Sequence, residues 1–219
     1  MYICLEGLKG SGKSSLLTAT QQLLTTRQIE FALVEPTRPV PAESSWPERL
    51  SAQLPCLRRL DAWNEWLYAH RARYAAATAC WQQPLVLGDR SVVTSYATRW
   101  RKWGSPHECI RRVDRLEARV PAPDHVVLLD VEPELAWERA RARGRCYGLH
   151  DETLPRLRAT RAAYEEIAAF PVPRLQHTQW HVLDGNQPPA ALLQQWWALM
   201  RRLTPDALFH TELNLNSTP

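Results

Sequence analysis

The chain has 219 residues, of which 45% are hydrophobic and 23% are charged, and its formal net charge is +4. This length suffices for one α/β domain, or two small ones, with a buried core. A net charge of +4 is too small to argue for nucleic-acid binding, and no apolar run approaches the ~20 residues that span a bilayer.

The five cysteines are scattered along the chain without a C-x-x-C pair. Such scattered cysteines are typical of reduced thiols rather than of a disulfide or zinc framework, so we expect a cytoplasmic protein. Because an apolar run begins at Tyr2, we expect no signal peptide.

A glycine-rich segment over residues 7–15 follows the apolar run at residues 2–5. It fits the G-x-x-x-x-G-K-[ST] phosphate-binding pattern, with a short strand before it and a helical stretch after it. Glycines let backbone N–H groups turn inward as an anion nest, and the helix N-terminus adds partial positive charge. Lys13 can reach the β- and γ-phosphates, and the Ser14 hydroxyl can ligate Mg²⁺. We therefore expect a nucleoside triphosphate to bind this loop, which consists of Gly7, Leu8, Lys9, Gly10, Ser11, Gly12, Lys13, Ser14 and Ser15.

Hydrophobic spacing after the loop predicts a helix over residues 14–26, a strand over 31–35 and a long helix over 57–81. Five prolines between residues 36 and 55 predict a loop with a short helix at best. Arg71 lies at the edge of the long helix's apolar face. A buried guanidinium there needs an acceptor, which a substrate could supply.

An apolar strand predicted over residues 85–89 ends in Asp89, and Arg90 follows it. A carboxylate at a strand end beside a phosphate loop can hold Mg²⁺ through water. The arginine is placed to neutralise a phosphoryl group. A simple ion pair at the end of the strand is the alternative interpretation.

The remaining chain alternates helices and strands. A basic helical stretch over residues 92–119 is split near residue 105, and we interpret its charge as a solvated face rather than a nucleic-acid patch. Strands are predicted over 125–131 and 181–184, with helices over 132–144, 154–169 and 188–202, and a tail over 204–219. This alternation predicts one α/β domain over residues 1–203, with three layers around a five-stranded parallel sheet.

The ordered set of motifs resembles the thymidylate kinase family over almost the whole chain. Residues 6–15 resemble its phosphate loop, and Glu35-Pro36 occupies the place of its Arg-Glu-Pro segment. Residues 67–71 resemble the helix whose arginine contacts thymine, and Asp89-Arg90 resembles its Asp-Arg pair. The resemblance implies a P-loop kinase fold with an Arg-bearing lid near residues 144–154, ATP and Mg²⁺ as cofactors, and a homodimer.

Site roles follow from the motifs and from this resemblance. The expected catalytic residues are Lys13, Asp89, Arg90, Arg143, Arg145 and Glu35, with Ser14 and Asp89 as metal ligands. Arg139 and Gln187 join the phosphate loop in binding ATP. The acceptor is expected to contact Glu35, Arg38, Leu67, Arg71, Arg90 and Thr94.

Departures from the family pattern lie around the acceptor. They are Val34 in place of an arginine, Lys9 in place of an acidic residue, Leu67 in place of an aromatic, Thr98-Arg99 in place of Tyr-Gln, and Gly148 in place of a lid arginine. They draw the chain toward the related deoxynucleoside kinases, which it also resembles. A nucleoside 5′-hydroxyl needs a carboxylate base, here Glu35, whereas a monophosphate needs arginines. The first hypothesis is phosphorylation of dTMP, with a deoxynucleoside kinase as the alternative and a non-catalytic nucleotide-binding protein as a third.

Overall fold

A parallel five-stranded sheet forms the centre of the computed structural model, which describes residues 1–142 and 153–205. The strand order is β2-β3-β1-β4-β5. The strands are β1 (Tyr2–Gly7), β2 (Ala32–Val34), β3 (Val86–Asp89), β4 (His125–Asp130) and β5 (Gln179–Asp184). The predicted α/β class with a five-stranded parallel sheet is confirmed.

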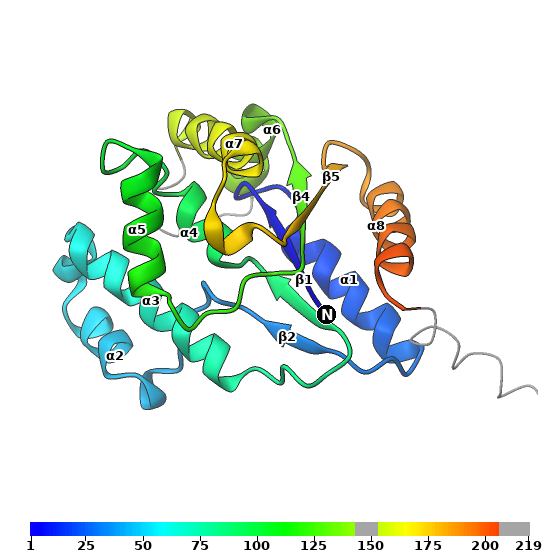
Figure 1. Cartoon of the computed structure of the whole chain (residues 1–219), viewed down its shortest axis with the longest axis horizontal. Helices are drawn as coiled ribbons and strands as arrows, with labels where there is room; N and C mark the ends of the chain where they lie inside the picture. Colours follow the sequence, from blue (N-terminus) through cyan, green and yellow to red (C-terminus); the bar gives the residue numbers. More distant parts are fainter. Residues whose placement is uncertain (143–152, 206–219) are drawn as a thin grey trace, which may run out of the picture.

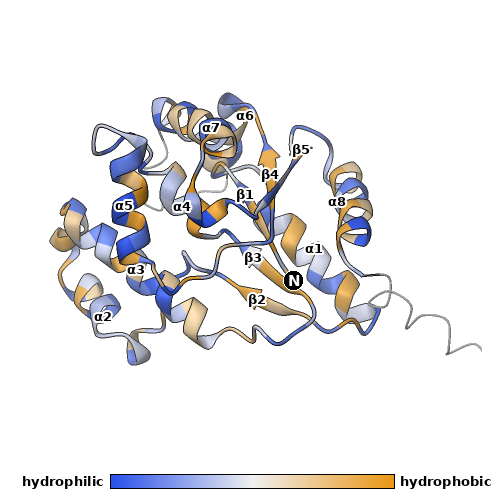
Figure 2. Cartoon of the chain, in the orientation of Figure 1, coloured by the Kyte–Doolittle hydropathy of each residue, from blue (hydrophilic) through white to orange (hydrophobic). Residues whose placement is uncertain are grey.

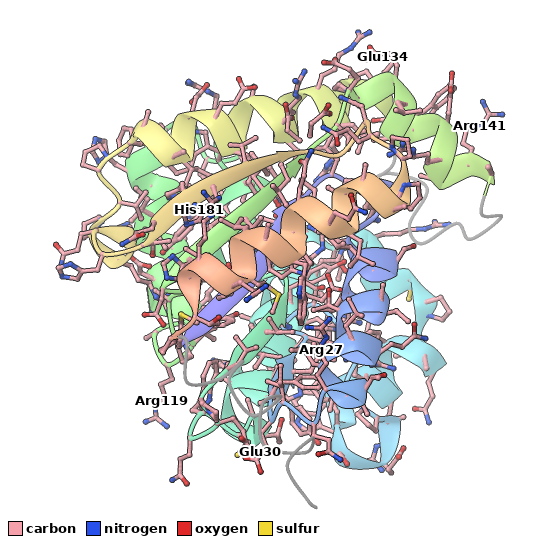
Figure 3. All side chains as sticks on the ribbon, turned by 90° about the vertical axis from the view of Figure 1, so that its right-hand side faces the viewer. Arg27, Glu30, Arg119, Glu134, Arg141 and His181 are labelled. Atoms are coloured by element: carbon pink, nitrogen blue, oxygen red, sulfur yellow. The ribbon has the colours of Figure 1, made fainter. Side chains whose placement is uncertain are left out.

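Helices cover both faces of this sheet (Figure 1). Helices α1 (Lys13–Thr26) and α8 (Pro189–Leu203) lie side by side on one face, as Figure 3 also shows. Helices α4 (Val92–Ala97), α5 (Pro106–Leu116) and α7 (Leu154–Ala169) lie on the other face. The remaining helices are α2 (Trp46–Gln53), α3 (Asp61–Thr78) and α6 (Pro133–Ala142), with short 3₁₀ turns at Ala42–Ser44, Pro55–Arg59 and Pro173–Leu175.

The two faces of the sheet carry two separate apolar cores, because successive side chains of a strand point to opposite faces. On β1, Ile3 and Leu5 pack into the core beneath α1 and α8, whereas Tyr2 and Cys4 pack into the other core. Figure 2 shows hydrophobic residues concentrated on the inner strands, while β5 at the edge is largely hydrophilic. A strand buried on both faces explains the uninterrupted apolar runs in the sequence.

Several element boundaries differ from those predicted. The long helix spans Asp61–Thr78 rather than residues 57–81, because a proline-led 3₁₀ turn occupies Pro55–Arg59 and Ala79 is extended. The basic stretch forms a six-residue α4, then turns, then α5, whose N-cap Ser105 accepts a hydrogen bond from the Glu108 N–H at 3.3 Å. The proline-rich segment does contain one short helix, α2, with Ser45 as its N-cap.

Parallel pairing brings the carboxyl ends of all five strands to one edge of the sheet. Leu5 of β1 pairs in register with Asp89 of β3, and Asp130 of β4 pairs with Asp184 of β5. Ligands bind outside this edge in open α/β sheets. Within the described residues, the helices are too short or too polar to cross a membrane.

Candidate active site

The phosphate loop joins β1 to α1 and lies against α6. Gly10 has a φ of +85°, and a Cβ atom there would lie 2.0 Å from the carbonyl oxygen of Ala136. Gly12, the N-cap of α1, has a φ of +96°. Only glycine adopts these left-handed angles at no steric cost, so the loop conformation requires the glycines of the motif. The loop therefore ends at the partly positive N-terminus of α1.

Lys13 is buried, at 6% exposure, and is positioned by the loop itself. Its ammonium group donates to the carbonyl oxygens of Gly7 at 3.0 Å and Leu8 at 2.7 Å, and to Ser11 Oγ at 3.0 Å. These contacts hold the positive charge of Lys13 at the loop, where the motif is expected to bind the phosphates of a nucleoside triphosphate.

Ser14 and Asp89 are the predicted metal ligands. Ser14 lies exposed in the first turn of α1, and Asp89 ends β3 beside β1. No group of three or more His, Cys, Asp and Glu residues in the described chain is placed to hold a metal ion. Mg²⁺ usually takes only one or two protein ligands and completes its shell with waters and substrate phosphates, so this hydroxyl and carboxylate fit it.

Arg90 follows Asp89 in a backbone conformation that is uncommon for a non-glycine residue, with a φ of +75°. Its N–H donates to the Leu5 carbonyl oxygen at 3.1 Å. Its Nη1 donates to the Gly7 carbonyl oxygen at 3.3 Å and to Thr94 Oγ1 at 3.1 Å. A left-handed non-glycine residue costs roughly 1–2 kcal/mol, so these contacts oppose the strain and aim the side chain at the phosphate loop.

A buried carboxylate that the sequence analysis did not single out, Glu6, is 0% exposed and is linked to Arg90 through the Thr94 hydroxyl. It accepts hydrogen bonds from Ser91, Thr94 and Tyr164. Burial acts to lower the pKa of Arg90, but the negative charge of Glu6 acts against this, and the pKa is raised overall. Arginine is always charged in proteins, so the buried Glu6 carboxylate provides a compensating negative charge for the Arg90 cation.

Among the residues predicted to contact the acceptor, Glu35 follows β2 and forms an ion pair with Arg38 through Oε2 and Nη1. The Glu35 side chain is 28% exposed and that of Arg38 is 69% exposed. The hydrogen bond to Glu35 is the main cause that raises the pKa of Arg38, and the charge of Asp89 adds to it. The structure thus brings Arg38 near both carboxylates.

The buried guanidinium of Arg71 has an acceptor within the protein itself, so it does not depend on a substrate for one. Its Nε and Nη2 donate to the two carboxylate oxygens of Glu48 on α2, at 2.5 and 2.9 Å. The side chains are 11% and 7% exposed, so the pair is nearly buried. Leu67 on the same helix is 3% exposed. Contacts of Arg71 and Leu67 with an acceptor base remain predictions.

The Tyr68 ring is contacted both by Arg71 and by Arg99, the residue that departs from the family's Tyr-Gln pair. The guanidinium carbon of Arg71 lies 5.1 Å from the ring centroid, and that of Arg99 lies 5.9 Å from it. Arg99 is 8% exposed, and its Nη1 lies 3.8 Å from a Glu117 carboxylate oxygen. The arginine that replaces the family's glutamine is therefore accommodated by a buried acid.

The predicted ATP-side residues lie between α6 and the loop after β5. Arg139 Nη1 donates to the Gly185 carbonyl oxygen at 2.9 Å. Asp184 accepts hydrogen bonds from Asn186, mainly from its backbone N–H, which lowers the pKa of that carboxyl group. Gln187 Nε2 lies 3.4 Å from Asp184 Oδ2. Arg143, Arg145 and Gly148 lie outside the described residues.

Glu6 and Glu48 differ in how far the sequence could have revealed them. Glu6 interrupts a buried apolar strand, and a buried carboxylate needs hydrogen-bond partners, so its position was an available signal. Glu48 lies in the proline-rich segment. Periodicity does not determine where that segment packs, so no comparable signal existed for its pairing with Arg71.

Comparison with known proteins decides the family. The sequence model described as thymidylate kinase matches residues 5–195, which contain the phosphate loop, Asp89-Arg90 and Arg139. The chain belongs to the thymidylate kinase family. The resemblance noted from the motifs is therefore confirmed.

Individual relatives agree with this membership. The chain is 30% identical to a thymidylate kinase of Idiomarina loihiensis over 197 residues, covering 85% of this chain and 89% of the relative. It is 30% identical to one of Halorhodospira halophila over 212 residues, covering 93% and 95% of the two chains. It is 26% identical to one of Pseudoalteromonas translucida over 170 residues, covering 76% and 82%.

Proposed function

We propose that this chain transfers the γ-phosphoryl group of ATP to dTMP, forming dTDP, and that residues 1–203 act as a single kinase domain. The observation that carries the proposal is the thymidylate kinase family match over residues 5–195. Lys13 and Arg90 both donate to the Gly7 carbonyl oxygen, at 3.0 and 3.3 Å, and two cations that meet there support a donor phosphate meeting an acceptor phosphate at this point.

Phosphoryl transfer requires positioning and charge rather than covalent chemistry from the protein. Lys13 and the start of α1 bind the donor phosphates, and Arg90 orients the acceptor phosphate. Ser14 and Asp89 would hold Mg²⁺, which would supply further positive charge at the phosphates. Arg71 orients the acceptor base, Arg139 and Gln187 contact adenine, and Arg143 with Arg145 remain the candidates for additional positive charge.

The alternative, a deoxynucleoside kinase, requires Glu35 to take a proton from a 5′-hydroxyl. The Arg38 ion pair at Glu35 favours a role in positioning the acceptor instead. The family match also favours a monophosphate acceptor. Homodimer formation, which the family resemblance implies, remains a prediction.

An acceptor screen tests the proposal. ADP formation is measured in a coupled assay with ATP and Mg²⁺, using dTMP, other nucleoside monophosphates and thymidine as acceptors. We expect dTMP-dependent turnover that Lys13→Ala reduces by at least about 10²-fold, because the loop lysine stabilises transition-state charge. Lys102→Ala serves as the matched lysine control, since Lys102 pairs with Asp61 and Glu65 instead.

Two outcomes would contradict the proposal. Turnover with thymidine but not with dTMP would establish the deoxynucleoside reading. ADP formation that stays at background with every acceptor would establish the non-catalytic reading.

A further inference from the structure

A fully buried carboxylate joins three elements beneath the acceptor arginine. Glu6 Oε1 accepts from the Ser91 N–H at 2.7 Å and from Ser91 Oγ at 2.8 Å. Glu6 Oε2 accepts from Thr94 Oγ1 at 2.5 Å and from the Tyr164 hydroxyl at 2.9 Å. We call Glu6, Ser91, Thr94 and Tyr164 the Glu6 cluster; it connects the end of β1 to α4 and to α7.

The Glu6 cluster contacts Arg90 from two directions. Through the backbone, Glu6 accepts from the residue directly after Arg90, whose own φ is +75°. Through side chains, Arg90 Nη1 donates to the same Thr94 Oγ1 that donates to Glu6. The Tyr164 hydroxyl lies 3.2 Å from that oxygen as well. One carboxylate therefore restrains both the backbone and the guanidinium of Arg90.

Core cohesion alone does not call for a carboxylate at this position. Burying an ionised carboxylate is costly unless all its lone pairs are used, and apolar groups of similar volume often stabilise a core equally well. Here four hydrogen bonds use both oxygens, and the negative charge raises the pKa of the neighbouring Arg90, against the effect of its burial.

We propose that Glu6 is a positioning residue for Arg90, with Tyr164 holding the Glu6 carboxylate in place, so that the cluster determines affinity for the acceptor's phosphate. The proposal rests on the proposed function, which assigns the acceptor phosphate to Arg90. It adds Glu6, Ser91 and Tyr164 to the residues on which the reaction depends, although none of the three is expected to touch a substrate.

Tyr164→Phe tests the proposal, because it removes one hydroxyl and keeps the buried ring. Its matched control is Tyr96→Phe, since Tyr96 is also buried and its hydroxyl donates to a different carboxylate, Asp114. With the best acceptor from the screen, we expect Tyr164→Phe to raise the acceptor KM about 3- to 10-fold and to leave the ATP KM within about twofold, because the hydrogen bond that Tyr164 donates to the Glu6 carboxylate is lost. Tyr96→Phe should change neither KM.

Equal changes in the two KM values, no change in either, or the same acceptor effect in Tyr96→Phe would overturn the proposal, because a purely structural role affects both substrates alike. Failure of the proposed function is distinguishable, since it appears as absent acceptor-dependent turnover in the wild-type protein.

Amide hydrogen exchange of the Ser91 N–H in the ligand-free protein gives a readout that requires no activity. We expect Glu6→Gln and Tyr164→Phe to accelerate this exchange at least several-fold relative to core amides of β3, and Tyr96→Phe to leave it unchanged. An unchanged Ser91 rate in both cluster variants would overturn the proposal whichever acceptor the enzyme uses.

Discussion

Glu35 is the residue on which the choice between the two kinase readings depends. It follows β2 at the carboxyl edge of the sheet, and its carboxylate is held by Arg38. A general base must be free to reach the proton that it abstracts. A carboxylate that anchors an arginine instead acts by placing positive charge near an acceptor phosphate.

Glu35→Gln separates these roles. If the acceptor is dTMP, we expect kcat to fall by less than about tenfold, whereas loss of a general base costs about 10²–10⁴-fold. The measurement is kcat and KM for dTMP and for thymidine in the coupled assay. Glu43→Gln, an exposed carboxylate in the same segment, is the control and should behave as wild type.

At the scale of elements, α1 and α8 are held together by a buried polar contact as well as by apolar packing. Trp196 of α8 is fully buried, and its indole Nε1 donates to Thr20 Oγ1 of α1 at 2.7 Å. Thr20 Oγ1 in turn donates to the Leu16 carbonyl oxygen at 2.7 Å. Since α1 begins directly after the phosphate loop, this contact also supports the proposed donor site.

Thr20→Val is expected to lower the free energy of unfolding by about 1–3 kcal/mol. The valine keeps the shape of the side chain but leaves the buried indole N–H without an acceptor. Urea denaturation followed by tryptophan fluorescence measures the effect. Thr18→Val is the matched control, because Thr18 lies exposed on the same helix, and its midpoint should stay close to that of the wild type. Equal midpoints for both variants would contradict the assignment.

At the scale of the whole molecule, the two ends of the parallel strands carry different groups. The candidate site lies at their carboxyl ends, whereas the amino end of β4 and the adjacent part of β5 carry two histidines that face one another. His125 Nδ1 and His181 Nε2 are 3.3 Å apart, and Figure 3 shows His181 on β5. Partial burial lowers the pKa of both imidazoles below 6.5, and the charge of His125 adds to the shift of His181.

This pair predicts a loss of stability in mild acid. Because the folded-state pKa values are lowered, the unfolded chain binds more protons as the pH falls through 6.5 and below, so the contribution present above 6.5 is lost. We expect the urea midpoint to fall between pH 7.5 and pH 5.5, and to fall less in His181→Asn. His177→Asn, at an exposed position, should keep the wild-type pH dependence. An unchanged slope in His181→Asn would contradict the assignment.

The sequence alone determined the succession of strands and helices along the chain, the phosphate loop, the place of Asp89-Arg90 at the end of a strand, and the family. These features are local: periodicity reports which side of an element is buried, and the glycines of the loop are required by its backbone angles. The 57–81 helix was predicted too long at both ends. At its N-terminal end the reason is that a 3₁₀ turn and a helix start have similar apolar spacing over a few residues.

Only the tertiary structure decided which charged groups meet. Glu6 and Tyr164 are 158 residues apart in the chain, and Glu48 lies 23 residues before Arg71, yet each pair is joined by a hydrogen bond. Such pairs depend on how whole elements pack against one another, which no local spacing encodes. Because a buried charge is stable only with its partner in place, the packing of α2, α4 and α7 decides how the arginines of the proposed acceptor site are held.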